Sequence, residues 1–233
     1  MGRRLPRRND DRLLTGAAHE KVMSPQDHAE TEQEAFWRGE FGDEYARRNA
    51  SDRWVAANLA LFTRILRSAP GIASIVELGC NIGLNLRALR QIDPDVRLCG
   101  YEINDRAAEA ARALSIAEIR KQSLLTPGLG DGETFDLSFT KGVLIHIDPQ
   151  SLDRAYENLV ALSSKYVLVS EYYNPTPISI NYRGHSHKLF KRDFAGDLLD
   201  KFDLELVDYG FVYHRDNYFP QDDNTWFLLR WRR

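Results

Sequence analysis

One stretch, residues 72–104, constrains the fold of this chain more than any other part of its sequence. It begins with a short apolar run rich in β-branched residues (72–76), which predicts a strand buried on both faces. A turn with glycines and a helical pattern of apolar residues (84–92) follow. A second apolar run (96–101) predicts another strand, so the order of elements predicts one βαβ nucleotide-binding unit.

The turn and the end of the second strand indicate what this unit binds. Gly79 and Gly83 let the backbone approach a ligand where a Cβ atom would collide with it. Glu102 ends the second strand, where a carboxylate can accept hydrogen bonds from both hydroxyls of a ribose. A dinucleotide-binding turn would have glycine at the position of Asn81, and the chain lacks the Gly-Lys-Ser/Thr of a P-loop. The alternative is an ordinary βα turn with incidental glycines.

The rest of the chain continues the alternation of strands and helices. Further strands are predicted near 117–124, 134–140 and 166–170, with connections that should make them pair in parallel. Two more strand patterns, 204–213 and 225–231, are joined by a short polar loop and should pair antiparallel. The predicted fold is α/β: a Rossmann-like, doubly wound, mostly parallel seven-stranded sheet with an antiparallel last strand and an N-terminal helical extension.

The turn resembles that of a known enzyme class. Its spacing, Glu-x-Gly-x-x-x-Gly from Glu77 to Gly83, is the pattern by which Rossmann-like methyltransferases that use S-adenosylmethionine are identified. A reversed last strand on a parallel sheet is also typical of that class. The resemblance implies S-adenosylmethionine as cofactor and S-adenosylhomocysteine as product.

Several longer segments, spread over residues 30–231, resemble one group within that class. The group is the methylases associated with pseudaminic acid biosynthesis, and the segments are TEQEAFWRGEFGDEYARRN, ELGCNIGLN, TKGVLIHIDP, EYYNPTPISINYRGH, LFKRDFAGDLL, DYGFVYHRD and QDDNTWFLL. The resemblance implies a methyltransferase. It suggests a sugar-like acceptor only weakly, because the name of the group comes from association with sugar biosynthesis genes.

The chain divides into three predicted parts. Residues 1–28 predict a disordered tail. Residues 29–69 predict an N-terminal helical cap, in which Thr31 and Glu34 form a capping-box pattern. Residues 70–233 predict the S-adenosylmethionine-binding methyltransferase domain. In methyltransferases of this class such a helical region folds over the cofactor; the alternative is a docked extension whose aromatic residues are merely buried.

Composition excludes several kinds of partner. The net charge is −3, from 31 basic and 34 acidic side chains, and gives no general attraction to nucleic acid or to a membrane. Two cysteines, Cys80 and Cys99, provide neither a disulfide framework nor zinc-ligand spacing, so no metal and a cytoplasmic setting are expected. The expected partner is a small-molecule substrate. The oligomeric state stays open, with a homodimer as one option.

The cofactor residues are predicted from the turn, from the carboxyl ends of the strands and from the helical cap. Gly79 and Asn81 should contact the methionine and ribose portion, and Ser123 and Leu124 should flank the adenine. The cap provides aromatic rings and a guanidinium that could cover the adenine or meet a carboxylate. The predicted cofactor-binding residues are Trp37, Tyr45, Arg48, Gly79, Asn81, Gly83, Glu102, Ser123, Leu124 and Lys141.

Catalysis and substrate binding are predicted around the ends of the fourth and fifth strands. His146 is a candidate general base for a hydroxyl acceptor, since an imidazole has a pKa near 6.5; the alternative is a structural histidine on an apolar run. Residues 173–190 are predicted to be a loop, whose tyrosines and arginine suit a polar, anionic molecule. The predicted catalytic residues are His146, Tyr172 and Tyr182, and the predicted substrate-binding residues are Glu171, Tyr173, Asn174, Arg183 and His185.

Three functions remain as hypotheses. The first is methylation of a polar, anionic small molecule of the sugar or nonulosonic-acid type, with O-methylation favoured over N-methylation of an amine, a guanidine or a peptide. The second is a non-catalytic protein that binds the cofactor within a biosynthetic complex. The third, methylation of RNA or protein, is disfavoured by the near-neutral charge and the lack of a basic stripe.

Overall fold

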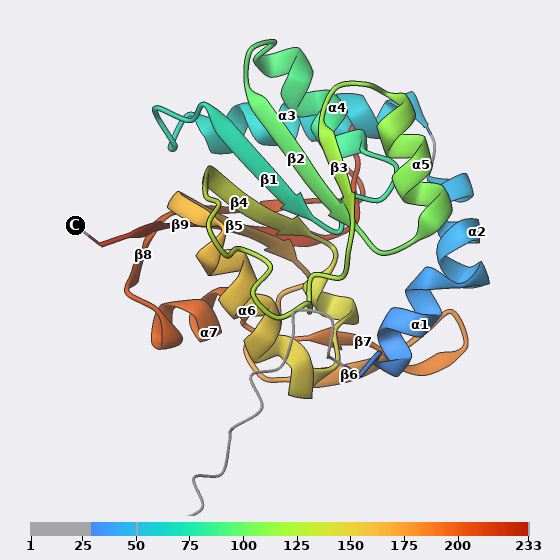
Figure 1. The fold of residues 1–233 in the computed structure, drawn as a ribbon. Helices are drawn as coiled ribbons and strands as arrows, with labels where there is room; N and C mark the ends of the chain where they lie inside the picture. The colour runs from blue at the N-terminus through green and yellow to red at the C-terminus, as the bar shows by residue number, and fades with distance from the viewer. Residues whose placement is uncertain (1–28, 50, 233) are drawn as a thin grey trace, which may run out of the picture.

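A computed structural model of the chain describes residues 29–49 and 51–232 (Figure 1). The predicted tail, residues 1–28, lies outside the described residues. The centre of the described structure is a seven-stranded sheet in the order β3-β2-β1-β4-β5-β9-β8. The strands are β1 (Ser74–Leu78), β2 (Arg97–Glu102), β3 (Glu118–Lys121), β4 (Phe135–Lys141), β5 (Ser163–Glu171), β8 (Leu204–Val212) and β9 (Asn224–Trp231).

The direction of the strands agrees with the predicted fold. The pairs β1–β2, β1–β4, β2–β3 and β4–β5 are parallel. The last strand, β9, runs antiparallel to both of its neighbours, β5 and β8. The prediction of a mostly parallel seven-stranded sheet with a reversed last strand is therefore confirmed.

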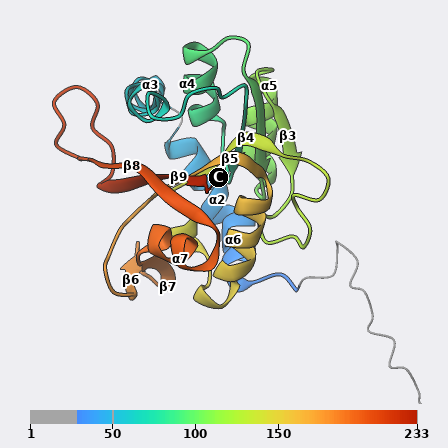
Figure 2. The ribbon, with the colours of Figure 1, turned by 90° about the vertical axis from the view of Figure 1, so that its left-hand side faces the viewer.

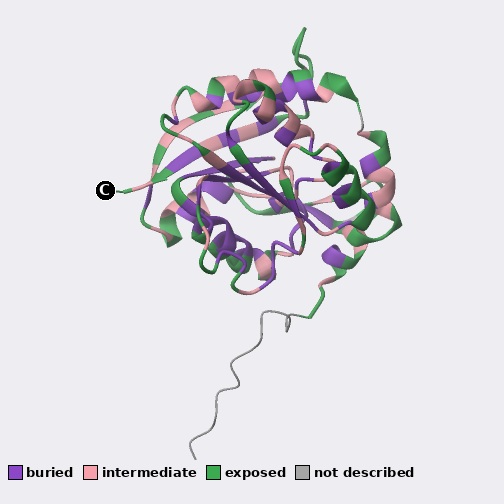
Figure 3. Cartoon of the chain, turned by 45° about the horizontal axis from the view of Figure 1, so that its top comes forward, coloured by how far each residue is buried: buried purple, intermediate pink, exposed green. Residues whose placement is uncertain are grey.

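Helices cover both faces of the sheet, as Figures 1 and 2 show. One apolar cluster joins the sheet to α3 (Asp52–Leu66), α4 (Leu84–Ile92) and α5 (Asp105–Ala113). A second cluster joins its other face to α6 (Leu152–Ala161) and α7 (Phe194–Lys201). Because both faces are covered, most residues of the inner strands are buried (Figure 3), which explains their largely apolar sequences.

Two short helices, α1 (Glu32–Arg38) and α2 (Glu40–Arg48), precede α3 and lie at the carboxyl edge of the parallel strands. The predicted capping box starts α1: Thr31 accepts a hydrogen bond from the Glu34 amide, and the Glu34 carboxylate accepts one from the Thr31 amide at 2.8 Å. The division of the chain into a cap and a methyltransferase domain stays a prediction.

The segment predicted as a loop at 173–190 contains a β-hairpin instead, so that prediction is wrong. Its strands are β6 (Ile178–Tyr182) and β7 (His185–Lys191), which pair antiparallel. Arg183 and Gly184 connect them, with φ of 49° and 88°. Two residues with positive φ form the tight turn that matches the twist of a hairpin. The hairpin lies against α1, where Lys188 pairs with Glu32 at 2.6 Å (Figure 1).

Candidate functional site

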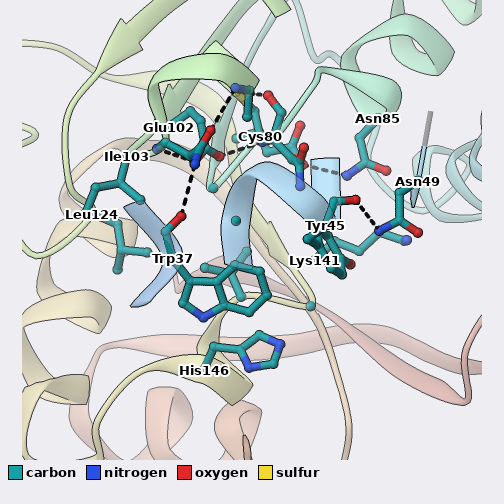
Figure 4. A pocket seen from close by; sticks show the side chains of 18 of the residues that line it. Trp37, Tyr45, Asn49, Cys80, Asn85, Glu102, Ile103, Leu124, Lys141 and His146 are labelled. Carbon is teal, nitrogen blue, oxygen red and sulfur yellow. Dashed lines mark hydrogen bonds between the residues drawn. The ribbon is translucent and has the colours of Figure 1, made fainter. Parts of the chain in front are cut away.

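A cavity of about 250 Å³ opens at the carboxyl ends of the parallel strands, beneath α1 and α2. This is the edge where ligands bind in open α/β sheets. Eleven of the predicted site residues line it, namely Trp37, Tyr45, Gly79, Asn81, Glu102, Ser123, Leu124, Lys141, His146, Tyr172 and Tyr182. Figure 4 shows several of them converging from the turn after β1, from α1 and from the end of β4.

The turn after β1 is shaped by one glycine in particular. Gly79 has φ of 79°, and a Cβ atom built on it would lie 2.7 Å from a methyl group of Val143. The amides of Gly79 and Cys80 both donate to the carbonyl oxygen of Tyr101, at 2.8 and 2.9 Å. These two bonds hold the turn against the end of β2, so the backbone itself forms part of the cavity wall.

Glu102, at the end of β2, is buried, and its carboxylate binds backbone amides of two segments, the turn after β1 and the residues that follow β2. Its carboxylate accepts hydrogen bonds from the amides of Asn81, at 2.7 Å, and Asn104, at 2.8 Å. Burial raises the pKa of Glu102. Asn104 in turn donates to the carbonyl oxygens of Trp37 and Arg38, at 3.2 and 3.1 Å. This chain of contacts links the turn, β2 and the helices above the cavity.

The next part of the wall is apolar, with polar groups at its rim. Ile103 and Leu124 line it beside the Trp37 ring (Figure 4). The Ser123 hydroxyl donates a hydrogen bond to the Glu34 carboxylate. Glu34 was considered only as a capping residue in the sequence, because nothing in a local pattern shows that α1 folds back onto β3.

Glu77, the acidic residue of the glycine pattern, is completely buried beside Asn85. The Asn85 amide donates to Glu77 Oε1 at 2.5 Å, while Glu77 Oε2 and Asn85 Oδ1 lack hydrogen-bond partners in the described structure. Burial raises the pKa of Glu77 to about 8. Both residues line the cavity. The sequence analysis used Glu77 to identify the pattern and did not name it as a site residue.

Lys141 ends β4 and reaches the same cavity. Among residues 29–49 and 51–232, its ammonium forms no hydrogen bond or ion pair. Burial lowers the pKa of Lys141, and the charges of Glu77, Asp222 and Glu171 oppose that shift. A cation in this position can meet a negatively charged group of a bound molecule.

His146 lies on η1 (Leu144–His146), a short 3₁₀ helix after β4. Its Nδ1 atom is 2.7 Å from the carbonyl oxygen of Lys188 on the hairpin. A carbonyl oxygen only accepts hydrogen bonds, so Nδ1 carries the proton and Nε2 keeps its lone pair. Burial lowers the pKa of His146 to about 4, so the imidazole is neutral at physiological pH. Its ring packs against Trp37 and Tyr182, with centroids 4.6 and 5.0 Å away.

Glu171, a predicted substrate residue, contacts the backbone of η1 and not the cavity. Its buried carboxylate faces the amides of Val143, Leu144 and Ile145, at 3.1, 3.2 and 3.4 Å. Burial raises the pKa of Glu171 to about 7, and these amide bonds oppose the shift. The geometry assigns Glu171 to the positioning of η1, and therefore of His146.

Six other predicted residues also lie outside the cavity lining. Two were predicted to bind the cofactor. Arg48 is exposed, with its guanidinium 5.7 Å from the centre of the Phe41 ring. Gly83 begins α4 with φ of 78°, and a Cβ atom there would meet Leu114 at 3.0 Å, so it allows close packing behind the turn.

The remaining four were predicted to bind substrate. Tyr173 is 42% exposed and packs on Phe227, and Asn174 donates to Thr176 within its own loop. Arg183 is exposed in the hairpin turn, and His185 is an exposed residue whose ring contacts Phe36 at 5.0 Å.

The segment before β9 supplies lining residues that are not among the predicted site residues. Gln221, Asp222 and Asn224 all face the cavity. From the sequence alone, the pair Asp222-Asp223 would most simply shape the turn before the last strand, and the alternative is that it binds an amine. In the structure only Asp223 shapes the turn, since its carboxylate binds the amide and ring of His214. The reversed direction of β9 brings its first residue to the carboxyl edge of β5, which places this segment at the cavity.

Comparisons with known proteins identify the fold. No protein-family model matches the chain, and a search of curated proteins finds no match. Among solved structures, magnesium protoporphyrin IX methyltransferase from Synechocystis PCC 6803 with bound SAM aligns with a TM-score of 0.62 and 14% identity, over 88% of this chain and 100% of that one. The N-methyltransferase NodS from Bradyrhizobium japonicum WM9, in complex with S-adenosylhomocysteine, gives 0.58 and 16%, over 82% and 98%.

A third similar structure is the plantazolicin methyltransferase BpumL in complex with S-adenosylhomocysteine. It aligns with a TM-score of 0.57 and 13% identity, over 86% of this chain and 94% of that one. Together these likenesses show that the chain has the Rossmann-like fold found in S-adenosylmethionine-dependent methyltransferases. The names of these proteins differ widely, from magnesium protoporphyrin IX methyltransferase to plantazolicin methyltransferase, so the fold leaves the substrate open.

Residues 29–49 and 51–232 contain no helix that is long and apolar enough to cross a membrane. They also contain no group of three or more histidine, cysteine, aspartate or glutamate side chains that could hold a metal ion.

Proposed function

We propose that the protein is a methyltransferase that binds S-adenosylmethionine in this cavity and methylates a small polar molecule. The observation that carries the proposal is the convergence of the Gly79 turn, Glu102 and His146 on one cavity at the carboxyl edge of the sheet. A nucleoside-binding turn alone would fit many ligands. The fold, with its reversed last strand, makes a methyltransferase the best supported choice.

The cavity has suitable groups for each part of this cofactor. Glu77 Oε2 and Asn85 Oδ1, which lack partners in the described structure, would accept hydrogen bonds from the ammonium of its methionine part. Glu102 would bind the ribose hydroxyls, and Ile103 and Leu124 would enclose the adenine. A cation near Glu77 would also favour its ionised form.

When bound, the cofactor supplies a methyl group on a positively charged sulfur. The protein then has to align the acceptor atom and exclude water. Trp37, Tyr182 and the ring of His146 pack together around the cavity and form a largely apolar surface. His146 Nε2 would accept the proton of an acceptor hydroxyl as its oxygen bonds to the methyl carbon.

We propose O-methylation as the first candidate reaction, because His146 presents a neutral nitrogen lone pair to the cavity. The resemblance of residues 30–231 to methylases associated with pseudaminic acid biosynthesis supports a sugar-like acceptor. The two cysteines are buried free thiols, in agreement with a cytoplasmic reaction. N-methylation of an amine is the second candidate, and the carboxylate of Asp222 at the cavity favours it.

Cofactor binding and turnover are tested separately. Isothermal titration of the full chain with S-adenosylhomocysteine should show one site with a dissociation constant of roughly micromolar magnitude. Gly79→Ala should abolish this binding, because its Cβ atom would lie 2.7 Å from Val143 and distort the turn. Gly132, which has φ of 80° and open space around it, provides a control position for the change to alanine. Absence of binding by the wild-type chain would refute the proposal.

Transfer of labelled methyl groups to a panel of sugars, sugar acids and amines then tests for catalysis. Turnover with any of them supports the enzyme. Tight binding without turnover on the whole panel, including peptides, would favour a non-catalytic cofactor-binding protein. RNA bound in a salt-sensitive manner would instead favour a nucleic-acid substrate.

A further inference from the structure

Two adjacent carboxylates before β9 have different surroundings. Asp223 is bound by His214, whose Nδ1 lies 2.8 and 2.9 Å from its two oxygens and whose amide donates to one of them at 3.0 Å. Asp222 lines the cavity and forms no ion pair with any residue in 29–49 or 51–232. Asp223 therefore stabilises the local fold, while Asp222 faces the cavity in which an acceptor would bind.

Three tyrosines, Tyr45, Tyr172 and Tyr182, line the same cavity as Asp222. Burial, the charge of Asp222 and a hydrogen bond to it raise the pKa of Tyr172. Burial raises the pKa of Tyr45, and the nearby groups of Tyr182 and Asp222 add to that shift. These phenols therefore stay neutral, so they offer ring faces and hydroxyl donors without adding charge.

Basic side chains near this end of the cavity do not neutralise Asp222. Arg183 is exposed in the hairpin turn, 5.7 Å from the centre of the Tyr182 ring. The ammonium of Lys191 lies 5.0 Å from the centre of the Tyr172 ring. Lys141, which also lines the cavity, attracts Asp222 but forms no ion pair with it in the described structure. Neither Arg183 nor Lys191 lines the cavity.

The residues on either side of Asp222 add acceptor atoms. Gln221 Oε1 and Asn224 Oδ1 are buried and have no hydrogen-bond partner in the described part of the chain. Both residues line the cavity. Buried polar atoms without partners are costly, and here they belong to one four-residue segment that also contains Asp222, a carboxylate without an ion-pair partner among the described residues. Such a surface suits a ligand group that donates several hydrogen bonds and carries positive charge.

We propose that Asp222, which lines the cavity together with Tyr172 and Tyr45, binds a positively charged amino group on the methyl acceptor. The acceptor class is then a hydroxylated amine, such as an amino sugar, with its ammonium at Asp222 and the hydroxyl to be methylated at His146. This inference rests on the proposed function. It replaces the anionic acceptor expected from Arg183, since that residue lies outside the cavity lining.

Ligand binding tests the inference without the need for turnover. The full chain is loaded with S-adenosylhomocysteine, and binding of glucosamine, glucose and glucuronate is compared by ligand-observed NMR at about pH 6.5, where the amine is protonated. Glucosamine should bind at least about fivefold more tightly than glucose, and glucuronate should bind weakest. Replacement of Asp222 by asparagine should remove the difference between glucosamine and glucose.

Asp223→Asn is the matched control, because it removes the neighbouring charge outside the cavity. It should keep the preference for glucosamine, and both variants should bind S-adenosylhomocysteine as the wild type does. Equal binding of glucosamine and glucose, tighter binding of glucuronate, or no binding of any of the three would overturn the inference. If the wild-type chain does not bind S-adenosylhomocysteine, the proposed function itself is refuted. The failure of the inference and the failure of the proposed function are therefore distinguishable.

Discussion

At the scale of single residues, Glu102 has two partners before any ligand arrives. Its two oxygens accept hydrogen bonds from the amides of Asn81 and Asn104. A carboxylate has about four lone-pair sites, so two remain for the hydroxyls of a ribose. The same side chain can therefore hold the turn in shape and bind the cofactor.

The proposed double role of Glu102 can be tested by mutation. Glu102→Ala should weaken binding of S-adenosylhomocysteine by about 10- to 100-fold, because it removes the charged acceptor and releases two backbone amides. Glu102→Gln, which retains one acceptor oxygen, should lose less affinity. Isothermal titration gives the affinities, and thermal unfolding shows whether each variant is folded. An unchanged affinity in a folded alanine variant would remove Glu102 from the cofactor site.

Residues whose placement follows from local spacing could be predicted, while those whose side-chain direction depends on distant contacts could not. Gly79 and Glu102 were found because the βαβ pattern sets their positions. Glu171 and Tyr172 both stand at the end of β5, but successive residues of a strand point to opposite faces. The sequence showed that they were near the edge and did not show that only Tyr172 enters the cavity.

At the scale of elements, η1 depends on a single carboxylate from the neighbouring strand. Glu171 lies within hydrogen-bond distance of three successive backbone amides at the start of η1. Glu171→Ala would leave these amides without partners in a buried place. We expect the free energy of unfolding to fall by about 2–4 kcal/mol.

The same change should also affect catalysis, because η1 carries His146. Methyl transfer should fall at least about tenfold, since a small displacement of the base is costly. Glu171→Gln retains an acceptor oxygen and should recover most of the stability. Denaturant titration and initial rates measure the two effects. An alanine variant with wild-type stability and rate would show that Glu171 does not position η1.

The hairpin β6–β7 is the element that the sequence analysis missed. Pro175 and Pro177, together with several polar residues, indicated a loop. The signal that could have found it is the pair Arg183-Gly184 between two alternating segments. This pair is a weak signal for a hairpin turn, because arginine is rare at a position that needs positive φ. The contact of Lys188 with Glu32 then holds the hairpin against α1, and contacts of such sequence separation leave no local pattern.

At the scale of the whole molecule, buried carboxyl groups make stability depend on pH. Burial raises the pKa of Glu77 to about 8 and that of Glu171 to about 7, from an ordinary value of 4.5. Between about pH 4.5 and pH 8 the folded protein therefore holds protons that the unfolded chain has lost. Stability should fall as the pH rises through this window, and the loss should be complete about one pH unit above the pKa of Glu77, at roughly pH 9.

Thermal unfolding as a function of pH measures this effect. We expect the melting temperature to fall by roughly 4–8 °C between about pH 6 and pH 8. Glu77→Gln should reduce the slope, because the amide does not titrate, whereas Glu109→Gln on the exposed face of α5 should leave it unchanged. A glutamine variant at position 77 with the wild-type slope would contradict a raised pKa for Glu77.

The architecture could be predicted from the sequence because strands and helices alternate and parallel crossovers have one hand. The way in which α1 and α2 cover the cavity could not be predicted, because it depends on contacts such as that of Asn104 with Trp37, which are far apart in the chain. The order of the sheet thus follows from local patterns, while the size and lining of the cavity follow from long-range packing.

On the proposed function, one hydrogen bond between the hairpin and His146 would couple product release to the orientation of the base. The Lys188 carbonyl that holds the Nδ1 proton belongs to the hairpin that packs against α1. If the hairpin moves aside so that product can leave, the imidazole loses its fixed tautomer in the same movement. His146 would then be correctly oriented only while the hairpin is in place. On the proposed function, the protein in its open state would therefore not transfer the methyl group of the cofactor to water.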